Sequence, residues 1–256
     1  MRLFVGAAIC LQLGVARAEP ADLVTQPLVL DVGALHARLV LERNVSLRSQ
    51  GAPTSLAPDL WVGVAPRWQV GLVHSHAALG LLETGASLCV KQDPYGCDRL
   101  YRGGGIEARW SWKQGAFAVA PRGGLIARDV EPWKPAAIGG AAVRWTRGRF
   151  GITSDPYLRI GLASRGLGNR DALVIPVWFA MQPSCRWTVA VRTGVDGELA
   201  TWKDGWHVPF ALAVTARPPA GLEVGIELGF QSLLGPQNSY KERALQMWVG
   251  WRGQVW

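Results

Sequence analysis

Leu222-Glu223-Val224-Gly225-Ile226-Glu227-Leu228-Gly229-Phe230 is the stretch that decides the fold of this 256-residue chain. Its apolar residues stand at every second position, and the residues between them are glutamate or glycine. Successive side chains of a β-strand point to opposite faces. The stretch therefore predicts a strand with one apolar and one polar face, and those two faces require different surroundings.

The same alternation recurs along the chain in segments of about ten residues, which predicts about twelve strands. The expected strands cover residues 35–46, 58–65, 67–76, 104–113, 116–128, 136–146, 149–163, 172–181, 185–195, 207–217, 221–231 and 242–256. Short connectors alternate with generally longer polar ones, and Pro156 is expected to bend or bulge its strand. The pattern predicts an all-β fold, an up-and-down antiparallel barrel over residues 35–256.

Composition indicates that this barrel lies in a membrane. Tryptophan is abundant, at 13 residues, and charged residues make up 18% of the chain, below the usual quarter or so. The mature chain lacks the roughly eighteen consecutive apolar residues of a transmembrane helix. A chain that spans a bilayer without such a helix must close into a barrel, because lipid cannot satisfy open backbone groups. A secreted β-sandwich is the alternative fold, since its strands alternate too.

The N-terminus has the form of an export signal over residues 1–18. Met1-Arg2 supplies a positive start, residues 3–15 are mostly apolar, and Ala16-Arg17-Ala18 matches a cleavage site. Removing the signal lowers the formal charge from +8 to +6. The remaining arginines form no basic stripe, so nucleic acid is not an expected partner. Residues 19–34 are expected to form an N-terminal periplasmic segment.

These features make the chain similar to outer-membrane β-barrel proteins of Gram-negative bacteria, broadly the porin-like ones, over residues 35–256. Such proteins typically end in an aromatic residue that the barrel-assembly machinery reads, and Trp256 matches. Arg252 and Gln254 depart from the apolar residues expected four and two positions before the end. The resemblance implies a cell outer-membrane location, with membrane lipid and the assembly machinery as partners.

Charged residues that share the polar face of the expected strands are predicted to line the lumen. Because an arginine in mid-membrane lipid costs roughly 2–4 kcal/mol, these residues should face inward. The predicted lumen-lining residues are Arg38, Glu42, Arg67, Glu107, Arg109, Arg144, Arg186, Arg192, Glu223, Glu227 and Arg252. The excess of arginine favours anionic solutes if the lumen is open.

Aromatic residues gather near the short connectors, which are expected at the periplasmic rim. Amphipathic rings of this kind form girdles at headgroup level. The predicted girdle contains Trp68, Trp110, Trp112, Trp145, Trp187 and Trp256. A soluble core would not collect aromatic residues at alternate turns, so this distribution favours the membrane barrel.

Two local motifs contain residue types that can carry chemistry. Cys89 and Cys97 lie in the longest expected outer loop, and an oxidising compartment favours a disulfide between them. His74-Ser75-His76 suggests a hydrolase or metal site, but neighbouring strand residues point to opposite faces, which disfavours a Ser75–His74 pair. No catalytic residue, metal site or cofactor is predicted.

The most economical function is a narrow porin-like channel or transporter for small solutes, with a preference for anions. A first alternative is a plugged barrel, whose inward charges pair across the lumen and whose outer loops serve a structural or surface-binding role. An outer-membrane hydrolase is a second alternative. A narrow twelve-stranded interior is compatible with an open or a filled lumen.

Overall fold

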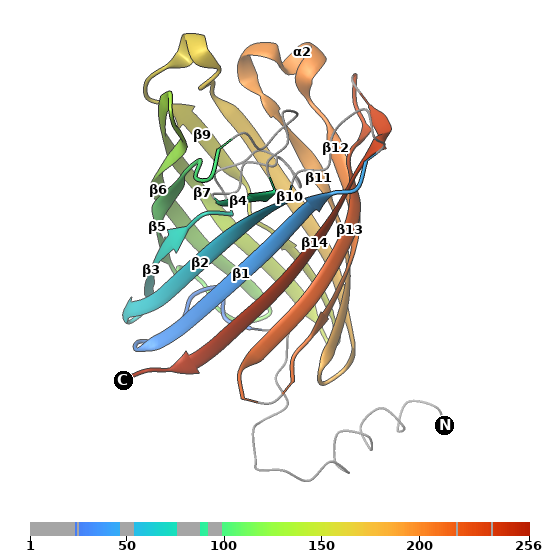
Figure 1. The fold of residues 1–256 in the computed structure, drawn as a ribbon. Helices are drawn as coiled ribbons and strands as arrows, with labels where there is room; N and C mark the ends of the chain where they lie inside the picture. The colour runs from blue at the N-terminus through green and yellow to red at the C-terminus, as the bar shows by residue number, and fades with distance from the viewer. Residues whose placement is uncertain are drawn as a thin grey trace.

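The computed structural model describes Val24 and residues 26–46, 54–75, 88–91, 99–218, 220–236 and 238–256. They form one closed antiparallel barrel with a wall of twelve strands (Figure 1). Its strands are β1 (Ala34–Asn44), β2 (Thr54–Ala65), β3 (Trp68–Val73), β4 (Leu88–Lys91), β5 (Gly104–Trp110), β6 (Phe117–Val130), β7 (Trp133–Arg147), β8 (Phe150–Ser154), β9 (Tyr157–Gly161), β10 (Ala172–Ser184), β11 (Trp187–Glu198), β12 (Val208–Ala216), β13 (Leu222–Leu234) and β14 (Ser239–Gln254).

Closure of the barrel comes from β1, which pairs with both β2 and β14. The other wall strands pair with their neighbours in chain order, as an up-and-down barrel requires. β4 pairs with the first two residues of β2 and adds no strand to the wall. Because β1 pairs on both sides, the described strands close into a ring, which confirms the predicted fold class.

One wall strand is built from two pieces, β8 and β9, which are separated at Pro156. Ser154 pairs with Val177 on β10, and Tyr157 pairs with Val174, so the spacing is equal on both strands. The register on β7 is unbroken as well. The expected interruption is confirmed, but the expected bulge is absent. Pro156 lacks an N–H, so the ladder lapses there and then resumes in register.

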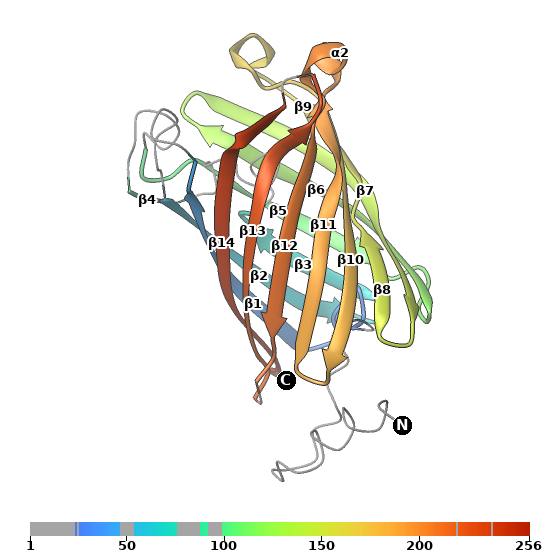
Figure 2. The ribbon, with the colours of Figure 1, turned by 90° about the vertical axis from the view of Figure 1, so that its right-hand side faces the viewer.

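The two ends of the barrel differ, as the connector lengths predict. Tight turns join the strands at the end where the chain terminates, whereas the opposite end carries η2 (Arg165–Leu167), η3 (Leu199–Thr201) and α2 (Trp202–Gly205) (Figure 2). The largest difference between an expected and an observed strand boundary is at β2. It begins at Thr54, and not at residue 58, because its first residues pair with the end of β1. We call the end with the tight turns the lower end.

Side chains on the wall alternate between an exposed apolar outer face and a mostly buried inner face. The outer face includes Leu60, Ile106, Leu125, Leu212 and Leu228, all of them well exposed. Exposed apolar patches of this extent are rare on soluble monomers and mark a surface that meets an apolar partner. No helix among the described residues is long and apolar enough to cross a membrane. The expected export signal, residues 1–18, lies outside the described residues.

Candidate functional site

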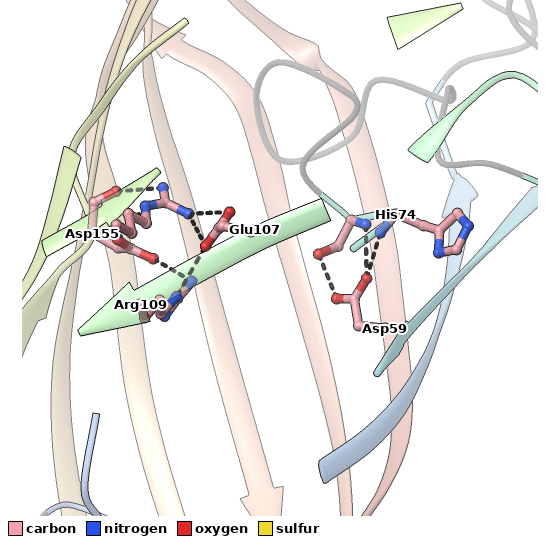
Figure 3. Close-up of polar contacts among 7 residues, drawn as sticks. Asp59, His74, Glu107, Arg109 and Asp155 are labelled. Atoms are coloured by element: carbon pink, nitrogen blue, oxygen red, sulfur yellow. Dashed lines mark hydrogen bonds and ion pairs between the residues drawn. The ribbon is translucent and has the colours of Figure 1, made fainter. Parts of the chain in front are cut away.

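A buried network of four charged side chains lies on one side of the interior (Figure 3). Arg122 binds Glu107 through Nη1, at 3.1 and 3.0 Å from the two carboxylate oxygens, and its Nε lies 2.9 Å from Asp155. Arg109 joins the same two acids, with Nε 3.0 Å from Glu107 and Nη2 3.1 Å from Asp155. Two arginines and two carboxylates therefore balance one another.

Two strands and one strand interruption position this network. Glu107 and Arg109 alternate with outward residues on β5, and Arg122 lies on β6, which pairs with β5. Asp155 sits between β8 and β9, where its backbone carbonyl also accepts a hydrogen bond from Arg122 at 3.3 Å. The Arg122 guanidinium lies 4.6 Å from the ring centre of Tyr157, a cation–π geometry.

A second set of charges lies on the opposite part of the wall. Arg192 on β11 pairs with Glu227 on β13 at 3.2 Å and lies over the ring of Trp178 at 5.3 Å. Arg38 on β1 lies over the ring of Trp248 at 4.8 Å. Each of these two arginines thus lies over the ring of an inward tryptophan.

Glycines make room for the large rings that point inward. Gly225 pairs with Trp248 across β13 and β14, and a Cβ at Gly225 would lie 2.1 Å from the Trp248 ring. Gly71 likewise pairs with Trp61, and a Cβ at Gly71 would lie 2.4 Å from the Trp61 ring. Gly225 and Gly71 therefore leave space for two inward tryptophan rings.

Between these walls lies a chamber of about 350 Å³. The charged side chains that line it are Arg38, Glu42, Arg122, Asp155, Asp196, Arg192, Glu223 and Glu227. Tyr157, Trp178 and Trp248 supply aromatic surface. Polar groups beside aromatic faces can hold a small solute by hydrogen bonds and by ring contacts.

The chain itself crosses the lower end of the barrel before β1 begins. The amides of Val24 and Leu30 donate to the side-chain oxygens of Gln182 (3.2 Å) and Gln69 (2.8 Å). Val29 packs against Ala120 and Ala142, two residues of the inner wall. We call Val24 with residues 26–33 the N-terminal segment; it lies inside the lower mouth (Figure 1).

The structure places most of the predicted lumen residues on the inner face. Arg38, Glu42, Arg192, Glu223 and Glu227 line the chamber, and Glu107 and Arg109 belong to the buried network. Arg144 lines a second cavity at the lower end, and Arg252 lies opposite His36 on the inner side of β14.

Arg67 and Arg186 are placed differently from the prediction. Both lie in exposed turns, between β2 and β3 and between β10 and β11. Arg67 has a positive φ of 69°, so it is a turn residue and not part of a strand face. The prediction for these two residues was wrong because side chains alternate between the two faces only along a strand, and both residues lie beyond the strand ends.

Several inner residues escaped the sequence prediction. Arg122 stands two residues after Ala120 and four after Ala118, both of which face inward. This spacing places Arg122 on the inner face and could have identified it from the sequence. Asp155 stands beside the strand-breaking Pro156, where strand parity is not a safe guide. Asp196 is also inward, and its Oδ1 lies 2.5 Å from His207 Nε2.

Most of the predicted girdle residues are exposed near the lower end. Trp68, Trp112, Trp145 and Trp187 stand at or beside strand ends, with exposed side chains. Trp110 is half-buried because its ring stacks on Trp68, with centroids 6.2 Å apart. Trp256, the last residue, is exposed.

The hydrolase motif has a geometry of its own (Figure 3). Ser75 donates its hydroxyl to Asp59 at 2.6 Å, and the His74 amide donates to the same carboxylate at 2.7 Å. The His74 ring contacts the Pro58 carbonyl through Nδ1. Asp59 therefore holds the end of β3 against β2, and the Ser75 hydroxyl contacts Asp59 while the His74 ring contacts Pro58. His76 lies outside the described residues.

Of the two cysteines of the predicted disulfide, Cys89 lies within the described residues. Cys89 is buried on β4, and no described cysteine is a free thiol. Cys97 lies outside the described residues, so its pairing with Cys89 stays a prediction.

Asp171 ties the outer loop after β9 back to the barrel. Its carboxylate accepts the Gly161 amide at 3.0 Å and pairs with Arg165. These hydrogen bonds, the backbone one first, lower the pKa of Asp171 below its ordinary value of 3.8. Because the folded pKa is depressed, the tether is complete above pH 3.8 and is lost as the pH falls through the lower folded value.

We therefore expect the Gly161 amide proton to report a titration with a midpoint below pH 3.8. The measurement is an NMR titration of the folded protein in detergent micelles. Asp171→Asn should remove this titration, whereas Asp204→Asn in α2 should leave it unchanged. A midpoint at or above 3.8 in the unaltered chain would show that the tether does not form.

Comparisons with known proteins agree at the level of the fold. No protein-family model and no curated protein matches the sequence. Among solved structures, the KdgM porin in complex with disordered oligogalacturonate aligns with a TM-score of 0.53 at 7% identity, over 85% of this chain and 98% of that one. The NanC porin aligns with a TM-score of 0.51 at 10% identity, over the same shares. The protein has the fold of the porin-like outer-membrane β-barrels.

Proposed function

We propose that this chain is an outer-membrane channel through which small solutes pass by way of the chamber. The apolar outer wall supports a position in lipid, and the fold shared with the KdgM and NanC porins supports the outer membrane. The observation that carries the proposal is the chamber itself, about 350 Å³ between charged and aromatic walls. Pockets of roughly 300–1,000 Å³ enclose small molecules.

Charge preference is the finer part of the proposal. The arginine excess in the sequence predicts anions, yet three arginines and five carboxylates line the chamber. Arg122 and Arg192 are also paired with carboxylates. These contacts support a weak preference for cations within the chamber, in place of the anion preference expected from composition.

Biogenesis is proposed to follow the route of related barrels. Trp256 is exposed at the end of the chain, just beyond β14, where an assembly factor can reach it. Its proposed partners are the barrel-assembly machinery during insertion and outer-membrane lipid afterwards.

Ion conductance in planar bilayers tests the channel. We expect discrete current steps in KCl, and in a KCl gradient a reversal potential of the sign for weak cation selectivity. A variant lacking residues 24–31 should be recorded in parallel, since the N-terminal segment occupies the lower mouth. Heat-modifiable migration on a gel confirms folding in both samples. If neither folded protein conducts, the channel proposal fails; a reversal potential of the anionic sign would overturn only the charge preference.

A closed barrel with a structural or surface-binding role is the second candidate. The observation that favours it is the N-terminal segment in the lower mouth, together with the filled network around Arg122 and Glu107. Persistent lack of conductance in both folded samples would favour this candidate.

A further inference from the structure

We propose that the N-terminal segment is a displaceable plug that closes the lower end of the channel and leaves the mouth when solutes pass. This inference rests on the proposed channel function and adds its regulation. The segment is held by side chains around the barrel wall, and its contacts are few enough to break.

The polar contacts of the segment are spread around the circumference. Gln69 on β3 accepts the Leu30 amide at 2.8 Å, and Gln182 on β10 accepts the Val24 amide at 3.2 Å. Arg217, just beyond β12, donates to Gln26 at 2.9 Å. β3, β10 and β12 lie on different parts of the ring, so the segment runs across the mouth and not along one wall.

Apolar contacts anchor the middle of the segment. Val29 is buried against Ala120 and Ala142 on β6 and β7. Leu30 is buried in a cluster with Trp61 and Val73, on β2 and β3. The wall therefore carries small side chains where the segment passes. A side chain larger than alanine at these positions of β6 and β7 would fill the space that Val29 occupies.

The strongest sign of a fitted plug is the approach to β2 at Gly63. A Cβ at Gly63 would lie 1.9 Å from the Asp31 carbonyl oxygen and 3.0 Å from that of Leu30. The Gly63 carbonyl also accepts the Gly33 amide at 2.9 Å. On the far side, a Cβ at Gly151 would lie 2.6 Å from the Val24 side chain. The glycines at the two ends of the segment let its backbone and side chains lie close to the barrel wall.

The chamber and a second cavity at the lower end share no lining residue. The chamber is lined by none of the residues of the segment. The second cavity, about 470 Å³, is lined by Pro27 and Leu28 together with residues of the lower turns, such as Ser111 and Gly148. Pro27 and Leu28 of the segment therefore form part of the wall of the lower cavity, and the chamber lies beyond the segment's own contacts.

These contacts are weak enough for the segment to move. Ordering each residue opposes binding through lost conformational entropy. In this segment three buried apolar side chains (Val24, Val29 and Leu30), the partly buried Leu28 and a few hydrogen bonds offset that loss. Elements with so few buried contacts open locally well before the barrel unfolds. β1 begins at Ala34, so the segment can leave without breaking the wall ladder.

A single methyl group tests the plug. Gly63→Ala places a Cβ against the backbone of Asp31, so the segment must shift while the rest of β2 keeps its space. The matched control is Gly139→Ala on β7, where a Cβ meets nothing within 4 Å. Both are strand glycines, so the change in backbone entropy is alike in the two variants. Deletion of residues 24–31 provides a second, independent opening.

Open probability in planar bilayers and liposome swelling in isotonic arabinose are the measurements. We expect Gly63→Ala and the deletion to raise both on the order of tenfold or more, with Gly139→Ala equal to the unaltered chain. If the unaltered chain conducts and neither variant exceeds it, the plug inference is overturned while the channel stands. Silence of all four folded proteins would overturn the channel and the plug with it.

Discussion

Arg122→Met is expected to destabilise the folded barrel by about 3–5 kcal/mol, because it leaves buried carboxylates without their main partner. The Glu107 side chain is 0% exposed and that of Arg122 is 1% exposed, so water cannot replace the lost guanidinium. After the change, Arg109 alone faces Glu107 and Asp155. Urea titration of the protein folded in lipid vesicles measures the difference.

Two further variants sharpen this result. Arg149→Met removes an arginine from an exposed turn and should change stability by no more than about 0.5 kcal/mol. Glu107→Gln combined with Arg122→Met restores the charge balance of the network. The double variant should therefore lose less stability than the sum of the losses measured for Arg122→Met and Glu107→Gln separately. Equal losses for Arg122→Met and Arg149→Met would show that the network does not support the fold.

The second expected result concerns the outer wall, where Leu228→Arg should destabilise the protein by about 2–4 kcal/mol in a bilayer. Leu228 lies midway along β13, is 56% exposed, and pairs with the equally outward Leu212. An arginine here must enter the hydrocarbon, whereas the neighbouring Glu227 faces the lumen. The readout is again urea unfolding in vesicles.

Leu222→Arg is the matched control, on the same face at the first residue of β13. Near the interface, the same substitution is expected to cost only about 0–1 kcal/mol. A depth dependence of this kind arises only when lipid surrounds the wall. Equal effects at Leu222 and Leu228, or purification of the chain without detergent, would exclude a membrane barrel.

Much of the wall could be predicted because its signals are local. Alternation along β13 marks both faces within nine residues, and the tight turns between strands separate one segment from the next. In an up-and-down barrel, chain order is also spatial order, so pairing follows once the strands are known. β14 illustrates this, since its expected range of 242–256 differs from Ser239–Gln254 only at its ends.

The contacts inside the barrel were less predictable. Parity assigns Arg109 to the inner face, but it does not give the height of Arg109 relative to Asp155, which lies 46 residues away. Height depends on the register of every intervening pair and on the stagger that closes the ring. The same limit explains why an arginine excess in the sequence did not translate into an arginine-lined chamber.

The sequence by itself thus determined a two-faced strand, its repetition and the order of the wall, because these depend on neighbouring residues and on the solvent each face requires. Only the tertiary structure decided which charges pair, that Arg67 and Arg186 lie in exposed turns, and where the N-terminal segment lies. The segment shows the reason most clearly. Leu28, Leu30 and Val32 alternate like a strand, yet Gly33, with φ of 76°, turns the chain before β1 and leaves them at the lower mouth. That placement depends on wall residues far away in the sequence, such as Ala120 and Gln182.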